Sequence, residues 1–274
     1  MIDATAASVV PTAMRRDNSA PAVSVRHVRV GYGSNVLLED ASFDVWRGEI
    51  LVILGGSGCG KSSLMKNIIG LYKPMAGDIL IGGRSIVDAK PDEKATLQRS
   101  LGVLYQSGAL FGSLTVLENV RFPLDQFTDL ALEPKNLTVR MLLHDLAMTQ
   151  SESLLPSELS GGMLKRAGLA RAMALGCDIL LLDEPASGLD PITGANLDQT
   201  ILSLRKNLGL TFIVVTHELQ SIFTIADRAI MLDATSRSII GEGKPSELKD
   251  HSSDARVRQF FNREPDTAAQ QSGT

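Results

Sequence analysis

The most informative segment of the chain is Gly55-Gly56-Ser57-Gly58-Cys59-Gly60-Lys61-Ser62. It matches the pattern G-x-x-x-x-G-K-[ST], follows the apolar strand pattern of Glu49–Leu54 and precedes a helical pattern from about Lys61 to Leu71. Glycines let successive backbone N–H groups point inward, and a helix start adds unpaired donors and partial positive charge. This phosphate loop, continued by Ser63, therefore predicts a nucleoside triphosphate site, with Lys61 on the β- and γ-phosphates and the Ser62 hydroxyl on Mg²⁺.

A second stretch, Ile179–Pro185, is an apolar strand that ends in two acidic residues. Ligands collect at the carboxyl ends of buried parallel strands, so we expect Asp183 to hold Mg²⁺ through water. Glu184 lies one residue further on, where a carboxylate orients and deprotonates the attacking water. Taken singly, a glycine loop with a stray lysine, or an Asp-Glu turn after a core strand, is ordinary structure. Their joint presence favours the catalytic interpretation.

The rest of the chain predicts an α/β fold around these stretches. Strand, helix and strand follow one another in an order that implies a parallel sheet with right-handed crossovers. From about residue 97 to 171, Leu, Met and Ala recur at helical spacing, which indicates an inserted, mostly helical subdomain. The other expected elements are strands over Val23–Val30, Ser42–Val45, Gly77–Gly83, Ile179–Leu182 and Thr211–Thr216, and a helix over about Thr193–Leu208.

Composition limits the class of protein. The 274 residues carry 27 Lys+Arg against 31 Asp+Glu, a net charge of −4, which argues against nucleic acid as a partner. We see no secretory signal and no apolar run near the about 18–20 residues of a membrane span. Two unpatterned cysteines fit a reducing compartment. We expect a flexible tail over 1–22, one catalytic domain over 23–250 and a C-terminal extension over 251–274. Its Arg256–Phe261 segment has three alternatives, namely packing on its own domain, which we favour, contact with the other subunit or binding of a small regulator.

Two further motifs complete the pattern. Leu159-Ser160-Gly161-Gly162-Met163, the signature segment, precedes a helix that runs to about Leu175. A hydroxyl, bare amides and a helix dipole form a second anion-binding device, although alone the segment would be only a helix cap. Thr216-His217 ends the next expected strand beside the Asp-Glu strand. A lone histidine is usually structural, and this placement favours a catalytic role for His217.

The motifs stand in the order of a known family. From Val23 to about Phe261 the sequence resembles the ATP-binding subunits of ATP-binding cassette (ABC) transporters, most specifically in the signature segment. The resemblance implies a P-loop NTPase (RecA-like) core with a parallel sheet, an antiparallel β subdomain and an inserted helical subdomain, acting on ATP with Mg²⁺. The order is Tyr32, the phosphate loop, Gln106, the signature segment, Asp183-Glu184, Ser187-Gly188-Leu189-Asp190 and His217.

The resemblance also implies roles for the matching residues. In that family two subunits hold two ATP molecules head to tail, so the signature residues Ser160, Gly161, Gly162 and Met163 face the ATP held by the partner's Lys61. Tyr32 would stack on adenine, its alternative being an incidental surface tyrosine. Gln106 would sense Mg²⁺ and water, Asp190 would lie at the dimer interface and His217 would contact the γ-phosphate. Met163 replaces the more frequent Gln and Gly188 the more usual Ala, and neither change removes a phosphate contact.

Some segments resemble one branch of the family. They are similar to the ATPases of Mla and Mce-type systems, which move phospholipids or other hydrophobic molecules between bacterial membranes. That branch implies a second copy of the chain, separate transmembrane permease subunits, an Mce-type lipid-binding protein and a small regulatory subunit. It also implies a peripheral place on the cytoplasmic side of the inner membrane. The segments are Tyr105–Val120, Pro156–Met163 and Asp254–Phe260.

Three alternatives stay open at this point. The first is the ATPase of a polar-substrate importer. The second is a soluble ABC ATPase acting on ribosomes or DNA, which generally carries two cassettes or a long coiled coil; this chain has one cassette and no sustained heptads. The third is a non-catalytic regulatory cassette. That alternative predicts a broken Lys61, Asp183-Glu184 or signature segment, and all three are intact.

Overall fold

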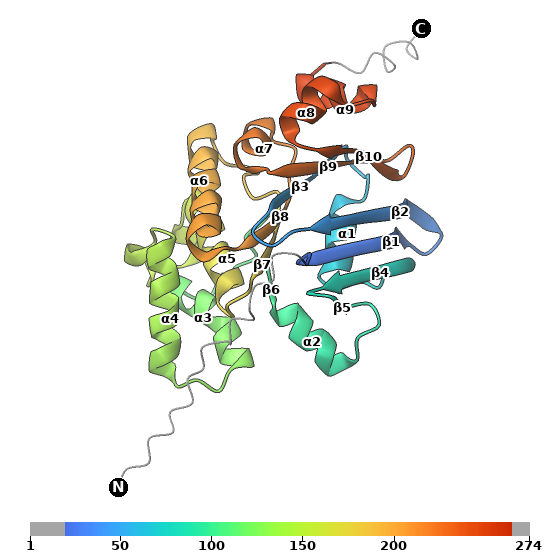
Figure 1. Ribbon diagram of the computed structural model, residues 1–274. Coiled ribbons are helices and arrows are strands. Elements are labelled where there is room, and N and C mark those ends of the chain that lie inside the picture. The colour runs from blue at the N-terminus through green and yellow to red at the C-terminus, as the bar shows by residue number, and fades with distance from the viewer. Residues whose placement is uncertain (1–19, 265–274) are drawn as a thin grey trace.

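The computed structural model describes residues 20–264, which form two β-sheets and the helices packed on them (Figure 1). The antiparallel sheet has the order β2 (Asn35–Val45), β1 (Val23–Tyr32), β4 (Ala76–Ile81) and β5 (Arg84–Ser85). The larger sheet has the order β10 (Ser238–Gly243), β9 (Arg228–Asp233), β3 (Ile50–Gly55), β8 (Thr211–Val215), β7 (Ile179–Asp183) and β6 (Leu101–Leu104). Its strands run parallel from β9 to β6, and β10 is antiparallel.

The helices connect these strands. Among residues 20–264, no helix combines the length and the apolar character that crossing a bilayer requires. The α-helices are α1 (Lys61–Ile68), α2 (Pro91–Arg99), α3 (Val116–Phe127), α4 (Leu132–Asp145), α5 (Gly161–Met173), α6 (Pro191–Leu208), α7 (Leu219–Ile225), α8 (Pro245–His251) and α9 (Ala255–Asn262). Two short 3-10 helices, Thr149–Ser151 and Pro156–Glu158, precede α5.

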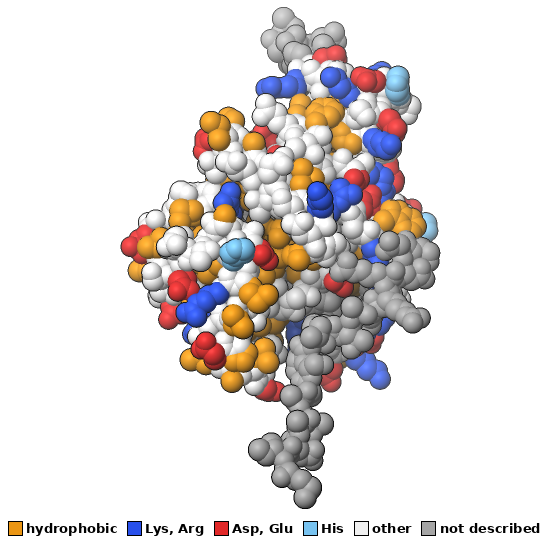
Figure 2. Space-filling view, turned by 60° about the vertical axis from the view of Figure 1, so that its left-hand side comes forward, with side chains coloured by type: hydrophobic (Ala, Val, Ile, Leu, Met, Phe, Trp, Pro, Cys, Tyr) orange, Lys and Arg blue, Asp and Glu red, His pale blue; other side chains and the backbone are white. Residues whose placement is uncertain are grey.

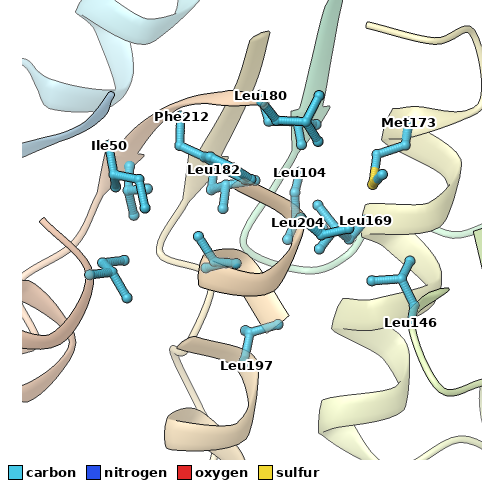
Figure 3. Packing of buried hydrophobic residues seen from close by; sticks show 14 of the residues in the cluster. Ile50, Leu104, Leu146, Leu169, Met173, Leu180, Leu182, Leu197, Leu204 and Phe212 are labelled. Carbon is cyan, nitrogen blue, oxygen red and sulfur yellow. The ribbon is translucent and has the colours of Figure 1, made fainter. Parts of the chain in front are cut away.

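The central strands are apolar throughout because both faces of the larger sheet are covered. On β3, Leu51 and Ile53 face a cluster shared with α1 and the antiparallel sheet, whereas Ile50, Val52 and Leu54 face the opposite cluster. On that opposite side, side chains from α5 and α6 pack against β3, β7 and β8 (Figure 3). Because successive side chains of a strand point to opposite faces, each central strand contributes to both apolar clusters, and the sheet is covered on both sides.

An ion-pair network joins the two sheets at their edge. Arg228, the first residue of β9, donates to Glu49 Oε1 at 2.8 Å and also to Glu242 and the carbonyl oxygen of Asp44 in β2. The Glu49 side chain is only 9% exposed and also accepts from the Trp46 N–H. The antiparallel sheet, whose strand β1 ends at Tyr32, is therefore held at a fixed position beside the larger sheet.

The structure differs from the sequence expectations at several elements. The segment 97–171, expected to be mostly helical, also contains β6, which is a strand of the larger sheet. Strands β9 and β10 were not anticipated from the sequence, because the turn that joins them, residues 234–237, contains no Gly or Pro. Residues 1–19 of the expected tail and 265–274 of the expected extension lie outside the described residues, and Ala22 is already fully buried. Helix α9 packs on its own domain through Val257 and Phe261, as expected.

Candidate functional site

The phosphate loop connects the end of β3 to the start of α1. Three glycines of the loop have positive φ: Gly55 at +144°, Gly58 at +78° and Gly60 at +98°. At Gly55 a Cβ would also lie 2.4 Å from the Leu232 carbonyl oxygen. Gly60 caps α1 without any side-chain hydrogen bond, so the first N–H groups of the helix face the loop. The Lys61 ammonium lies within the loop and donates to the carbonyl oxygens of Gly55 at 2.7 Å and Gly56 at 2.9 Å.

Gly56, Ser57 and Gly58 form the exposed rim of the loop, whereas Cys59 is fully buried. Burial raises the pKa of the Cys59 thiol, even though the Lys61 ammonium lies 3.8 Å from its Sγ. The thiol therefore packs as an apolar group beneath the loop. The groups of the loop that can bind phosphate or Mg²⁺ are therefore its backbone N–H groups, the Lys61 ammonium and the hydroxyls of Ser62 and Ser63.

Asp183 lies at the carboxyl end of β7, next to the start of α1. The Ser62 hydroxyl is 3.5 Å from Asp183 Oδ1, so the two residues that the sequence predicts at Mg²⁺ come together. Burial and the neighbouring Glu184 carboxylate raise the pKa of Asp183, and the Ser62 hydroxyl and nearby lysines oppose this shift. A carboxylate and a hydroxyl oxygen are hard donors of the kind that Mg²⁺ requires, and the donor set fits that ion.

Glu184 is held in a strained conformation beside His217. Its backbone has φ +47°, which is unusual for a residue other than glycine, and its N–H donates to the Val215 carbonyl of β8 at 2.8 Å. Glu184 Oε1 lies 2.8 Å from His217 Nδ1. The other carboxylate oxygen, Oε2, is buried and has no hydrogen-bond partner among the described residues. A buried carboxylate oxygen without a partner is costly, so the side chain is held in this position at the expense of folding free energy.

Gln106 and Tyr32 are also brought to this edge of the sheet. The Gln106 amide donates to the Ser187 hydroxyl at 3.1 Å, in the segment that follows Glu184. The Tyr32 hydroxyl donates to Ser63 Oγ at 3.1 Å, and the edge of the Tyr72 ring contacts the Tyr32 ring at a centroid distance of 5.6 Å. The Tyr32 side chain is 44% exposed, so much of its ring is accessible beside the phosphate loop.

The signature segment begins α5. Ser160 caps the helix by accepting the Met163 N–H at 3.3 Å. Gly162 lies against α6, because a Cβ there would be 2.5 Å from Thr193 Cγ2. Asp190 caps α6 and accepts from the N–H groups of Ile192 and Thr193. Across residues 20–264, no hydrogen bond joins the signature segment to the phosphate loop, so one chain presents the two anion-binding elements separately.

Two residues at the site were missed by the sequence reasoning. Ser187 lies within the quoted stretch Ser187-Gly188-Leu189-Asp190 and could have been found as a hydroxyl close to Glu184. Lys165 is buried at 5% exposure and its ammonium donates to the carbonyl oxygens of Gln106 and Glu184. The sequence signal for Lys165 is a charged residue placed among Leu164, Ala167 and Leu169 on the apolar face of the expected helix.

Comparisons with known proteins identify the family of this chain. Residues 38–187 match the family model described as ABC transporter. The chain is 39% identical over 241 residues to a probable ribonucleotide transport ATP-binding protein, mkl, of Mycobacterium leprae, covering 88% of this chain and 69% of that protein. It is 38% identical over 240 residues to the intermembrane phospholipid transport system ATP-binding protein MlaF of Escherichia coli K12, covering 88% of each.

Solved structures show the same fold. CbiO1 of Clostridium perfringens, part of the ABC transporter complex cbiONQ, superposes with a TM-score of 0.78 at 26% identity, over 92% of this chain and 99% of that one. The dimeric bacterial ABC transporter cassette MJ0796 gives a TM-score of 0.73 at 29% identity, over 81% and 98%. MJ0796 is also known in a post-hydrolysis state with ADP and phosphate bound. This chain therefore belongs to the ABC transporter family, as an ATP-binding and ATP-hydrolysing subunit.

Proposed function

We propose that this subunit hydrolyses ATP to power the movement of phospholipids or other hydrophobic molecules across or between bacterial membranes. The observation that carries the proposal is the similarity to MlaF, which extends over 88% of both chains. Ribonucleotide transport, named for mkl, is the second candidate function, a polar-substrate alternative that rests on 39% identity. That match covers 69% of mkl, so the end-to-end match with MlaF favours the lipid substrate.

In the proposed site, the phosphate loop binds the ATP phosphates through its backbone N–H groups and Lys61. Mg²⁺ would be held by Ser62, by Asp183 through water and by Gln106, and when bound it neutralises charge on the β- and γ-phosphates. Tyr32 stacks on adenine, since its accessible ring lies beside the start of α1. These assignments are supported by the 3.5 Å approach of Ser62 to Asp183.

Glu184 is proposed to prepare the attacking water. Its carboxylate accepts the water proton as the water oxygen attacks the γ-phosphorus in line. The bond between that phosphorus and the oxygen bridging to the β-phosphate breaks, which releases ADP and phosphate. His217 Nδ1 lies 2.8 Å from Glu184 Oε1 and so fixes the orientation of the carboxylate. The Glu184 backbone strain is consistent with a side chain held in one functional orientation.

The site is proposed to be completed by a second copy of the chain. The signature segment is exposed at Ser160 and Gly161 and lies apart from the chain's own phosphate loop in the hydrogen-bond network of the described residues. In a head-to-tail dimer each signature segment contacts the γ-phosphate bound by the other chain, with Asp190 at the interface. The dimeric cassette MJ0796 supports this arrangement. Hydrolysis is then coupled to closure of the dimer, which is the movement passed to partners.

The translocation path is proposed to lie in separate permease subunits that bind the surface around Gln106–Thr115. Phe111 in that segment is 45% exposed. The face that includes the helical segment carries many apolar side chains in Figure 2. Exposed apolar residues there, namely Phe127, Leu132, Leu137 and Met141, support a protein-binding role for this part of the molecule. Such docking would place the subunit on the cytoplasmic side of the inner membrane, near an Mce-type lipid-binding protein and a small regulatory subunit.

Extraction of the complex from native membranes in mild detergent tests the proposal. We expect mass spectrometry to identify a multi-span permease, an Mce-type protein and bound phospholipid with the full chain. A soluble solute-binding protein without lipid would contradict the lipid substrate and favour the polar-substrate importer. Purification without any membrane protein would contradict the transporter assignment altogether.

A further inference from the structure

Lys165 is a buried lysine that reaches out of its own helix. It lies in the second turn of α5, five residues after Ser160, and is 5% exposed. Its ammonium donates to the carbonyl oxygen of Gln106, and to that of Glu184 at 3.3 Å. One side chain therefore contacts the main chain of both loops that carry the proposed water- and Mg²⁺-handling residues.

The burial of this charge calls for a physical reason. A buried ammonium is costly unless it is well hydrogen-bonded, and burial lowers the pKa of Lys165 although the Glu184 and Asp183 carboxylates oppose this shift. An apolar side chain of similar volume would avoid the cost of burying the charge, so the lysine is not required for packing. What an apolar side chain cannot do is hold two carbonyl oxygens from different loops.

Both loops adopt backbone conformations that need support. Glu184 has φ +47°, and Ala109, three residues after Gln106, has φ +51°. Arg171, also on α5, donates to the Ala109 carbonyl at 2.6 Å and to the Gly108 carbonyl at 3.4 Å. Helix α5, which begins with the signature segment, thus holds the loop after β6 through two side chains, Lys165 and Arg171, which are six residues apart.

We propose that Lys165 is a positioning residue that sets Glu184 relative to Gln106 and fixes both to the helix carrying the signature segment. Through this side chain, a shift of α5 when the partner subunit closes on ATP is passed to the carboxylate that prepares the water. ATP binding to the phosphate loop does not depend on it, because Lys61 and the loop backbone have no hydrogen bond to Lys165 within residues 20–264.

The test compares Lys165→Met with a matched control in the full chain. Lys135→Met is the control, because Lys135 is also a buried lysine, 9% exposed, but is paired with Asp125 at 3.3 Å on the helical segment. For Lys165→Met we expect kcat for ATP to fall about ten- to a hundredfold with KM within twofold of wild type. Lys135→Met should keep the wild-type kcat. A kcat for Lys165→Met within twofold of the control, or a loss carried by KM, would overturn the proposal.

Two further measurements keep the test decisive if Lys165→Met folds poorly. Lys165→Gln retains a polar donor but is too short to span both carbonyls, so we again expect a lower kcat at unchanged KM. In hydrogen–deuterium exchange, both Lys165 variants should accelerate exchange in peptides covering 105–112 and 184–190 relative to Lys135→Met. Unchanged exchange in both segments would contradict the proposal. It rests on ATP hydrolysis and not on the transported molecule, so a failure of the lipid assignment leaves it standing.

Discussion

The phosphate loop and the signature segment are both glycine-bearing starts of helices, yet they are built differently. The phosphate loop begins at the end of a central strand, and its Gly55 is wedged against the backbone of β9. It carries no side-chain cap, and the Lys61 ammonium lies within it. The signature segment is capped by its own Ser160 and is exposed at Gly161, where an added Cβ would meet only the end of the Leu189 side chain, at 3.0 Å.

This difference indicates which of the two elements can bind nucleotide within a single chain. The phosphate loop has its donors converging within one chain and its lysine in place, so it can bind nucleotide without help. The signature segment presents a hydroxyl and bare backbone away from that loop. We propose that it meets a phosphate only when another chain brings one to it. We therefore expect damage to the first element to affect one chain's own chemistry or folding, and damage to the second to affect only the assembled site.

The largest effect is expected for Glu184→Gln, on the side of the phosphate loop. Replacing the proposed base with an amide should lower turnover about a thousandfold, because the amide cannot accept the water proton. ATP binding should persist, since the amide removes no phosphate contact. Steady-state hydrolysis and equilibrium binding of ATP measure both quantities. Glu133→Gln, an exposed carboxylate in the first turn of α4, is the control and should hydrolyse ATP normally. Near-normal turnover by Glu184→Gln would contradict its role.

Ser160→Arg addresses the other helix start. A bulky cation at the cap should block the approach of the partner's γ-phosphate and lower turnover about a hundredfold. The affinity of the chain's own phosphate loop for ATP should stay within twofold, because that loop is separate. Ser153→Arg, which adds the same side chain at an exposed position, should leave turnover unchanged. A parallel loss of ATP affinity in Ser160→Arg would show that the two elements act within one chain.

Two glycine substitutions compare the elements through stability. Gly55→Ala places a Cβ 2.4 Å from the Leu232 carbonyl oxygen at φ +144°, so it should lower the free energy of unfolding by about 2 kcal/mol. Gly161→Ala meets a flexible side-chain end at 3.0 Å and should change it by less than about 0.5 kcal/mol. Urea unfolding monitored by circular dichroism measures both. Equal losses for the two variants would remove the contrast between an embedded and an exposed loop.

The smallest effect is expected for Tyr32, which we propose stacks on the nucleobase. Tyr32→Leu removes the stacking surface and should weaken ATP binding about tenfold, equivalent to about 1.4 kcal/mol. Tyr32→Phe keeps the ring and loses only the hydrogen bond to Ser63, so its affinity should fall less than threefold. Titration with a fluorescent ATP analogue distinguishes the two. An unchanged affinity for Tyr32→Leu would make Tyr32 an incidental surface tyrosine.

Much of the fold was predictable because its signals are local. The alternation and apolar runs of β3, β7 and β8, and the glycine pattern before Lys61, each specify one element from a few adjacent residues. Strand β6 was hidden because Leu101–Leu104 has four residues inside a helix-rich stretch, and only its pairing with β7 makes it a strand. Strand β9 pairs with β3, which is far away in the sequence, and β10 pairs with β9 through a turn that lacks glycine and proline.

The site was predictable as a set of residues and much less as a network. The sequence placed Asp183 and Glu184 at one strand end, and parallel strand order brought His217 beside them. It did not indicate that the Glu184 backbone is strained, that one of its oxygens lacks a partner or that Lys165 spans two loops. Those properties arise from tertiary contacts between α5, the loop after β6 and the loop after β7. Hydrophobic periodicity in the sequence carries no information about such individual contacts.

We propose that each ATP lies between the phosphate loop of one chain and the signature segment of another. The most direct test is the molar mass of Glu184→Gln, by size-exclusion chromatography with light scattering, with and without ATP and Mg²⁺. We predict a monomer that becomes a dimer on ATP addition, and no ATP-dependent dimer when Ser160→Arg is added to the same chain. A chain that binds ATP but stays monomeric, or a dimer that persists with Ser160→Arg, would contradict the claim.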